Sequence, residues 1–349
     1  MRDIAIRETE NTPANVTHRR PLWCQCVTCA AAQPRFAAPT PLVVPVRRLC
    51  GAATTRGGVA ARGRRGHHKG RCGVGIRAAT TVARQTCGVD AGTDDDAPTA
   101  PALVDRVRAW VDQAQRITVV TGAGISTDSG IPDFRGPNGV WTKNPQAEKT
   151  ATLQHYLGDP EIRRLAWRNR VESPAFEAQP NVGHRAIASL QDRGRLLAVV
   201  TQNVDGLHQA GGTDPDKVIE VHGTIWWTRC WGCSDRRPMA EARDRVRAGE
   251  EDPPCRVCGG ILKSDTISFG QSLVPEVIDA AMVAAERCDL MIAAGSTLSV
   301  FPAANAVPRA KASGARILIV NGEPTAMDRF ADAVLLGSLS DLLPAILTL

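Results

Sequence analysis

Ile117-Thr-Val-Val-Thr-Gly-Ala-Gly124 is the stretch that decides the fold. A short run of apolar and β-branched residues ends in two glycines one residue apart, which is typical of a buried strand followed by a tight turn. Such a turn can bring backbone N–H groups close to a phosphate. The third glycine of the G-x-G-x-x-G pattern is missing, because Thr127 stands in its place. Alone, the stretch is therefore weak evidence for nucleotide binding, and an ordinary strand-to-helix turn is the alternative.

Further short apolar runs follow along the chain, and polar residues come after most of them. An amphipathic helix is predicted from about Pro101 to Val111, and a closing helix from Asp341 to Leu349. Strands that alternate with helices predict a parallel α/β sheet, in which ligands bind at the carboxyl ends of the strands. The other predicted strands are Leu196–Val200, Val218–Val221, Leu290–Ala294, Ile317–Val320 and Ala333–Leu336.

Two segments interrupt this alternation. Residues 140–182 are polar and helical in pattern, and residues 227–261 carry four cysteines. We expect these segments to form a smaller zinc-ribbon and helical lobe, inserted into a Rossmann-like parallel sheet domain with a cleft between the two. The predicted catalytic domain spans 99–349, with a large lobe of 99–139, 183–226 and 262–349.

The four cysteines are arranged as two C-x-x-C pairs. Cys230 and Cys233 form the first pair, and Cys255 and Cys258 form the second. Four thiolates at this spacing predict one closed tetrahedral zinc site, which stabilises structure and does no chemistry of its own. Two disulfides are the alternative, and a reducing compartment disfavours them.

The first 98 residues do not have the pattern of a folded domain. Residues 1–89 carry a net charge of +12 and the remainder −6, so the basic pI comes from the head of the chain. The pI is therefore no evidence for a nucleic-acid binder, and no sequence-specific nucleic acid is expected. A disordered basic tail, an organelle-targeting segment and a start codon placed too far upstream compete as explanations, and we favour the first and the last.

The apolar runs and the cysteines indicate where in the cell the protein is expected. No apolar run approaches the ~20 residues that cross a bilayer, so no membrane partner is expected. Reduced zinc thiolates favour a cytoplasmic location, with organelle targeting by the basic head left open. Cys24, Cys26 and Cys29 lack a second pair nearby, and we interpret them as unpaired tail cysteines.

Several motifs occur together in the order in which the sirtuins have them. They are Gly122-Ala-Gly-Ile-Ser126, Gly130-Ile-Pro-Asp-Phe-Arg135, Thr201-Gln-Asn-Val-Asp-Gly-Leu-His208, Val221-His-Gly223 and the paired cysteines. From about residue 100 to 349 the chain resembles this family of NAD-dependent protein lysine deacylases. The resemblance implies NAD as a consumed co-substrate, one structural zinc and acylated protein lysines as substrates.

The resemblance also implies roles for individual residues. His222 would be the general base, since an imidazole with a pKa near ~6.5 suits proton removal from a ribose hydroxyl. Asn203 and Asp205 would join it as catalytic residues, whereas His184 and His208 are expected to be structural. Phe134 would shield the reactive sugar carbon from water. The implied cofactor contacts are Gly122, Ala123, Gly124, Ile125, Ile131, Asp133, Phe134, Arg135, Gln202, Asn203, Asp205, Gly295, Ser296, Thr297, Asn321, Gly322, Glu323 and Leu339.

In the implied reaction an acyl-lysine amide oxygen displaces nicotinamide, and the products are O-acyl-ADP-ribose and free lysine. The peptide would add as a strand beside Phe269-Gly270. A mono-ADP-ribosyltransferase and a non-catalytic NAD sensor are the alternatives.

Departures from the family pattern concern the acyl substrate. Gln271 replaces the acid that many members carry after Phe-Gly. Trp167 and Arg170 have the spacing of a Tyr and an Arg that bind the acyl carboxylate in desuccinylating sirtuins. Arg170 could pair with a carboxylate, but Trp cannot supply the phenol, and we favour the alternative that Arg170 is a solvated charge on an Arg-rich helix.

Overall fold

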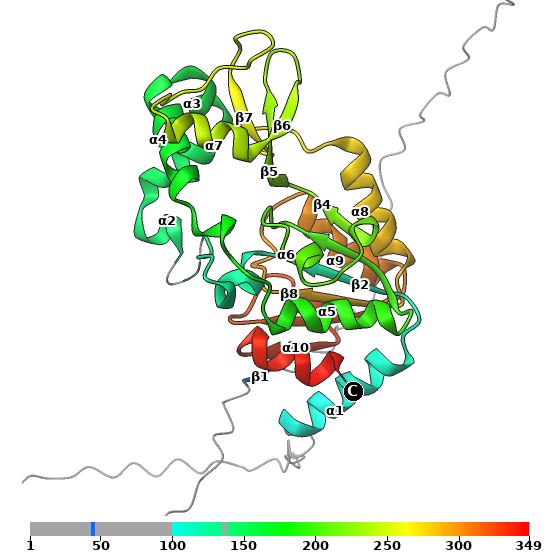
Figure 1. The fold of residues 1–349 in the computed structure, drawn as a ribbon. Helices are drawn as coiled ribbons and strands as arrows, with labels where there is room; N and C mark the ends of the chain where they lie inside the picture. Colours follow the sequence, from blue (N-terminus) through cyan, green and yellow to red (C-terminus); the bar gives the residue numbers. More distant parts are fainter. Residues whose placement is uncertain (1–42, 46–99, 135, 137–138, 349) are drawn as a thin grey trace, which may run out of the picture. The chain divides into compact units, whose positions relative to one another are not determined.

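Seven parallel strands form the central sheet of the computed structural model, which describes residues 43–45, 100–134, 136 and 139–348 (Figure 1). Their order across the sheet is β1-β10-β9-β8-β2-β3-β4. The strands are β1 (Val43–Pro45), β2 (Ile117–Thr121), β3 (Leu196–Thr201), β4 (Val218–Glu220), β8 (Leu290–Ala294), β9 (Arg316–Asn321) and β10 (Ala333–Leu336). The predicted Rossmann-like parallel sheet is confirmed, and all the predicted strands are present.

Helices cover both faces of this sheet (Figure 1). Residues of the central strands are buried on alternating sides, so that Val119 packs on one face and Val120 on the other. This double burial explains why the strands are continuous apolar runs. One face carries α1 (Ala100–Gln113), α5 (Val182–Asp192) and α10 (Leu339–Leu347), and the other carries α8 (Pro275–Arg287) and α9 (Ala306–Ala312). No described helix is long and apolar enough to cross a bilayer.

Strand β1 departs from the sequence-based expectation, because it lies within the first 98 residues. It pairs in parallel with the edge strand β10, with Val43 opposite Val334. Three residues are too short an apolar run to predict as a strand, and only the edge that β10 offers selects them. The remaining residues of the head, with Cys24, Cys26 and Cys29, lie outside the described part of the chain.

The smaller lobe combines a helical module with an antiparallel sheet. The helical segment that was expected over 140–182 contains no named strand in its described residues, as predicted. The three-stranded sheet β6-β5-β7 extends beyond the expected 227–261 at both ends, because β5 and β7 pair outside the cysteines. The elements are α2 (Val140–Lys143), α3 (Leu153–Gly158), α4 (Pro160–Glu172), β5 (Gly223–Cys230), β6 (Arg236–Pro238), α7 (Met239–Arg247) and β7 (Leu262–Thr266).

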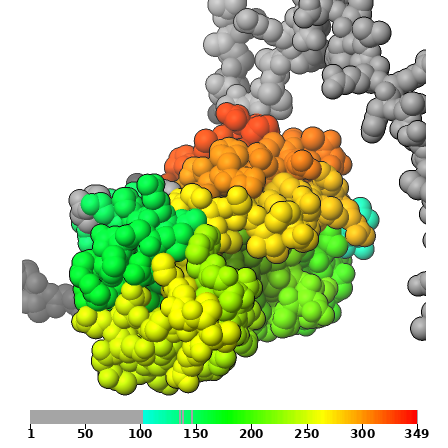
Figure 2. Space-filling view, turned by 90° about the horizontal axis from the view of Figure 1, so that it is seen from above, coloured from blue at the N-terminus to red at the C-terminus, as the bar shows by residue number. Residues whose placement is uncertain are grey.

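One apolar cluster joins the two parts of the smaller lobe. Trp167 of α4 is fully buried against Cys230, Cys255 and their neighbours. The helical module and the cysteine-bearing segment lie side by side, and Figure 2 shows them in green and in yellow. One cysteine of each pair therefore belongs to the core that orders α4.

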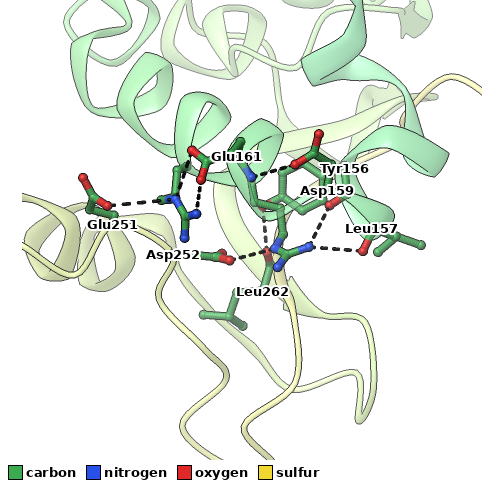
Figure 3. Close-up of polar contacts among 9 residues, drawn as sticks. Tyr156, Leu157, Asp159, Glu161, Glu251, Asp252 and Leu262 are labelled. Carbon is green, nitrogen blue, oxygen red and sulfur yellow. Dashed lines mark hydrogen bonds and ion pairs between the residues drawn. The ribbon is translucent and has the colours of Figure 1, made fainter.

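Polar contacts reinforce this junction (Figure 3). The buried Tyr156 hydroxyl donates to the carbonyl of Leu262 at 2.7 Å. Arg163 Nε donates to Asp252 Oδ2 at 2.8 Å, and Arg163 Nη1 donates to the carbonyl of Leu157 at 3.1 Å. The bond from Tyr156 fixes α3 against β7, and the bond from Arg163 to Asp252 fixes α4 against the segment between the cysteine pairs, so movement of that segment would disturb α4.

Two histidines are fully buried near the carboxyl ends of the parallel strands. His184 of α5 is 0% exposed and His208 of α6 (Leu207–Ala210) is 1% exposed, with their ring centroids 5.0 Å apart. Burial lowers the pKa of His184 to about 4 and that of His208 to about 3. Both rings are therefore neutral in the folded protein at neutral pH, as expected for structural histidines.

This burial predicts a steep acid destabilisation. Because both pKa values are lower in the folded state than the ordinary value of about 6.5, unfolding takes up protons below that pH, and stability is lost as the pH falls from 6.5 towards 4. The loss should be roughly 2 kcal/mol per histidine between pH 8 and pH 5. Urea unfolding across this range measures it.

The double variant His184→Gln/His208→Gln is the matched control, since glutamine does not titrate. It should lose clearly less stability than the unaltered protein over the same pH range. Equal losses in the two proteins would contradict neutral burial of the histidines.

Candidate active site

A cleft of about 1570 Å³ opens between the carboxyl ends of the parallel strands and the smaller lobe. Residues that follow β2, β3, β4 and β8 line it, together with residues of α4 and of the segment after β7. Ordinary small-molecule sites occupy about 300–1,000 Å³. The cleft is therefore larger than an ordinary small-molecule site.

The floor of the cleft is a close contact between two turns. Gly124 N–H donates to the carbonyl of Gly295 at 2.8 Å, so that the turn after β2 rests on the turn after β8. A Cβ on Gly124 would lie only 2.8 Å from the Gly295 oxygen, and Gly295 itself has φ of +65°. A side chain fits at neither position. These glycines thus have a packing role in addition to the phosphate approach that the sequence indicates.

Three polar side chains are joined at this floor. Ser126 Oγ donates to Asp205 Oδ2 at 2.7 Å and accepts from Asn203 Nδ2 at 3.1 Å. Burial raises the pKa of the Asp205 carboxyl, although the bonds from Ser126 and from Leu207 N–H oppose the rise. Ser126 also lines the cleft. It was not among the predicted contacts, although it is the first polar side chain after the glycine turn.

His222 lies just after the carboxyl end of β4, and a hydrogen bond holds one of its ring nitrogens in place. Its Nδ1 is 3.0 Å from the backbone carbonyl of Gln202, and a carbonyl can only accept, so the proton is assigned to Nδ1. Nε2 is then the unprotonated nitrogen. Burial lowers the pKa of His222, despite this hydrogen bond, which acts in the opposite direction. The neutral imidazole of a general base is therefore the stable form near pH 7.

Gln202 connects His222 to the turn after β8. Its backbone carbonyl accepts from His222, and its side-chain Nε2 donates to Ser296 Oγ at 2.9 Å. A single residue thereby sets the distance between the candidate base and the turn that holds Ser296. The predicted role of Gln202 as a cofactor contact is compatible with this position on the cleft wall.

An aromatic row forms one wall of the cleft. Phe134 and Trp141 have ring centroids 4.8 Å apart, and Trp141 and Phe269 are 5.1 Å apart. Trp141 was not among the predicted site residues; sequence gives it no motif, and only the fold brings it between the two phenylalanines. The row offers an apolar surface for the stem of a substrate side chain.

The expected peptide edge at Phe269 is already occupied. Phe269 N–H donates to the carbonyl of Ala151, and the Phe269 carbonyl accepts from Leu153 N–H, both at 2.9 Å. The expectation that a peptide pairs with the backbone of Phe269 is therefore wrong for this residue, because the segment before α3 uses both groups.

The structure brings nearly all the predicted site residues to one cleft. Ile125 does not line it, because its side chain is buried in the core of the sheet. Arg135 lies outside the described residues. The predicted residues that line the cleft are Gly122, Ala123, Gly124, Ile131, Asp133, Phe134, Gln202, Asn203, Asp205, His222, Gly295, Ser296, Thr297, Asn321, Gly322, Glu323 and Leu339.

Trp167 and Arg170, which have the spacing of an acyl-binding pair, differ in whether they reach the cleft. Trp167 is enclosed in the core of the smaller lobe and does not line the cleft. Arg170 does line it, and its Nη1 is buried without a hydrogen-bond partner among the described residues. The expectation of a solvated surface charge for Arg170 is therefore wrong. Two aromatic rings lie against its guanidinium group, since the guanidinium carbon is 5.3 Å from the ring centroid of Tyr156 and 5.0 Å from that of Trp167.

The four paired cysteines gather as predicted. Their Sγ atoms all lie within 4.8 Å of one another, with Cys230 and Cys258 at 3.5 Å and Cys233 and Cys255 at 3.7 Å. Four sulfurs at the zinc–sulfur distance of about 2.3 Å in a tetrahedron are about 3.8 Å apart, so the group fits zinc. Backbone N–H groups of Gly232 and Val257 donate to Cys230 and Cys255. All four thiols are free of disulfides.

Comparisons with known proteins agree with this site. The Sir2 family model matches residues 122–302. The NAD-dependent protein deacetylase 2 of Streptomyces coelicolor is 49% identical over 231 residues, which is 66% of this chain and 96% of that protein. The NAD-dependent protein deacylase of Thermococcus kodakarensis is 39% identical over 65% of this chain and 88% of its own length.

Solved structures give the same result. A structure described as "Sir2-p53 peptide-NAD+" has a TM-score of 0.63 and 30% identity, and covers 70% of this chain and 96% of its own. A Sir2 structure with a propionylated peptide has a TM-score of 0.63 at 28% identity, with the same coverage of both chains. The motifs, the cleft and these similarities lead to one conclusion: this chain belongs to the Sir2 family, the sirtuins.

Proposed function

We propose that this protein removes acyl groups from protein lysines and consumes NAD as it does so. The observation that carries the proposal is the state of His222. Its Nδ1 is bound to Gln202, its Nε2 has no partner among the residues that the structure describes, and it lines the same cleft as Asn203 and Asp205. Relatives named as NAD-dependent deacetylases and deacylases, at 39–49% identity, support the assignment.

Each residue then has one task in the reaction. NAD supplies a sugar carbon from which nicotinamide departs as the acyl amide oxygen attacks. His222 Nε2 takes the proton of a ribose hydroxyl, and Gln202 keeps the ring in the required tautomer. Asn203 and Asp205, joined through Ser126, hold the ribose and the carboxamide. Phe134, with Trp141 behind it, excludes water from the sugar carbon.

Product analysis tests this function against its alternatives. With labelled NAD and an acetylated peptide, deacylation gives nicotinamide, free lysine and O-acyl-ADP-ribose in equal amounts. Label that stays on protein would instead identify an ADP-ribosyltransferase. Bound but unconsumed NAD would identify a sensor, and either result would overturn the proposal.

The proposal also covers the protein partners, as a class, and the cellular location. Acylated protein lysines are the proposed partners, and the peptide complexes of similar structures support this. A cytoplasmic location stays a prediction, which the four free zinc-binding thiols support because they need reducing conditions.

Replacement of the base gives the first prediction for this function. His222→Asn keeps a donor near Nδ1 for the Gln202 carbonyl but removes Nε2, so deacylation should fall about 10²- to 10⁴-fold. NAD affinity should change little, because the fixed hydrogen bond is preserved. Steady-state kinetics and calorimetric NAD binding measure the two quantities.

The pH profile separates a base from a positioning role. Since burial holds the pKa of His222 below its usual value, the unaltered protein should lose activity only as the pH falls below about 6.5. This acid limb should be absent from the residual activity of His222→Asn. His155→Ala removes an exposed histidine outside the cleft and should have no effect. Turnover of His222→Asn at the unaltered rate would refute the assignment.

Metal removal tests the structural role of the zinc. Because Cys230 and Cys255 pack with Trp167, chelation should disorder the smaller lobe, abolish activity and change the near-UV signal of buried tryptophan. Cys233→Ser should do the same. Cys288→Ala, which alters a buried cysteine of the sheet core outside the zinc group, should retain about one zinc per chain and its activity. Full activity in metal-free protein would contradict the role.

A second candidate concerns the acyl group, which would end in a carboxylate. The unpartnered Arg170 Nη1 favours it, since a buried guanidinium nitrogen without an acceptor is costly. Lys263 adds positive charge nearby. Burial, and then the charge of Arg170, lower the pKa of Lys263 to about 7. An anionic acyl terminus would offset this crowding of cations.

A pair of peptides and a pair of variants test the acyl preference. If Arg170 binds a carboxylate, succinyl-lysine should be turned over at least about tenfold more efficiently than acetyl-lysine, and Arg170→Met should reverse the order. Arg168→Met alters an exposed residue of the same helix that does not line the cleft, and should leave the order unchanged. A preference for acetyl-lysine in the unaltered protein would eliminate this candidate.

A further inference from the structure

A chain of polar groups, all buried except the partly exposed Asn181, runs beneath the candidate active site, and none of them lines the cleft. Its members are Asn181, which caps the N-terminus of α5, His184 of α5, His208 of α6, Thr121 of β2 and Thr201 of β3. The two histidines and the two threonines are each at most 2% exposed. Buried polar groups at this density are costly unless they bond to one another, so their arrangement calls for a reason.

The threonine end of the chain reaches Asn203. Thr121 Oγ1 donates to Thr201 Oγ1 at 2.8 Å, and Asn203 N–H donates to the same Thr201 oxygen at 3.1 Å. Thr201 therefore fixes the backbone of Asn203 from below. The side chain of Asn203 reaches Ser126 at the floor of the cleft.

The tautomer of His208 follows from Thr121. A hydroxyl has one proton, and that of Thr121 is used on Thr201, so the His208 Nε2 atom at 2.9 Å from Thr121 Oγ1 is assigned as the donor. His208 Nδ1 is then an acceptor, and it has no partner among the described side chains.

The tautomer of His184 follows from Asn181. Asn181 N–H lies 3.3 Å from His184 Nδ1, and Asn181 Oδ1, at 3.1 Å, already accepts from two backbone N–H groups. Nδ1 is therefore assigned as an acceptor, which leaves Nε2–H as a donor without a described partner. The unpartnered donor of His184 is complementary to the unpartnered acceptor of His208 on the adjacent ring.

Asn181 returns the chain to the cofactor turn. Its Nδ2 donates to the carbonyl of Ile125 at 2.7 Å and to Ser129 Oγ at 3.0 Å. Ile125, Ser126 and Ser129 belong to one 3₁₀ helix, Ala123–Ser129. The chain of contacts thus begins beside Ser126 and ends at Asn203, the two residues that bond across the floor.

We propose that the path Asn181–His184–His208–Thr121–Thr201 is a positioning relay that sets the separation of Ser126 and Asn203. Between Asn181 and Thr201 the assigned donors all point towards Thr201, and the one step without a hydrogen bond is the contact of the two histidine rings, whose centroids are 5.0 Å apart. At its ends the path receives a bond from the Asn203 N–H and donates one from Asn181 to the carbonyl of Ile125. Its members touch no substrate and act through Asn203. The expected loss of kcat when Asn203 moves rests on the proposed function, whereas the geometry of the path does not.

Three threonine-to-valine variants test the relay. Thr121→Val and Thr201→Val remove one hydroxyl each at nearly constant shape. Thr118→Val is the matched control, since Thr118 is also on β2, is 0% exposed and donates one bond, to the carbonyl of Ala284. All three should lose similar stability. Only the relay variants should lower kcat, by about tenfold or more, with KM for the acyl-peptide changed less than about threefold.

Position 208 offers a rescue. His208→Gln places an amide donor near the Nε2 position and should retain most of kcat, whereas His208→Leu should lose as much as Thr121→Val. Relay variants with the kcat of Thr118→Val, or a His208→Gln no better than His208→Leu, would overturn the proposal.

Histidine nitrogen NMR tests the path without turnover. Nitrogen-15 spectra of the full chain should show both His184 and His208 as neutral Nε2–H tautomers, and Thr121→Val should shift His208 more than Thr118→Val does. A Nδ1–H tautomer for His208 would overturn the relay. An inactive unaltered protein with these spectra would overturn the proposed function and leave the relay standing.

Discussion

The hydrogen bond from Gly124 to Gly295 is the constraint on which the rest of the site depends. It closes the turn after β2 onto the turn after β8, and only residues without a side chain allow so short an approach. Ser126 is thereby brought to Asn203 and Asp205, and Ser296 to Gln202. Through Gln202 the same contact places His222. The parallel sheet supplies the strand ends, and this contact orders the turns that leave them.

The smaller lobe contributes a wall rather than chemistry. Its helices are held by a core that includes two of the four cysteines, so the metal stabilises α4 and the residues that α4 presents to the cleft. Arg170 is one of these residues. Under the proposed role of Arg170, a structural zinc would influence which acyl group is accepted without any contact with that group.

Sequence periodicity predicted the sheet well, because strands buried on both faces must be continuous apolar runs, as Leu290–Ala294 shows. It missed β1, which three residues encode and only the edge of β10 selects. Motifs located His222 and the cysteines but not Trp141, whose position depends on the packing of two phenylalanines. Arg170 was misjudged because exposure of a helical residue depends on a neighbour, Tyr156, that the helix does not contain.

The central claim is that His222 removes a proton from the sugar of NAD. A crystal structure of the protein with NAD and an acyl-lysine peptide tests it most directly. The account predicts His222 Nε2 within about 2.6–3.2 Å of a ribose hydroxyl, with Nδ1 still bound to the Gln202 carbonyl. A ring turned away from the ribose, or an Nε2 that bonds to the protein instead, would contradict it.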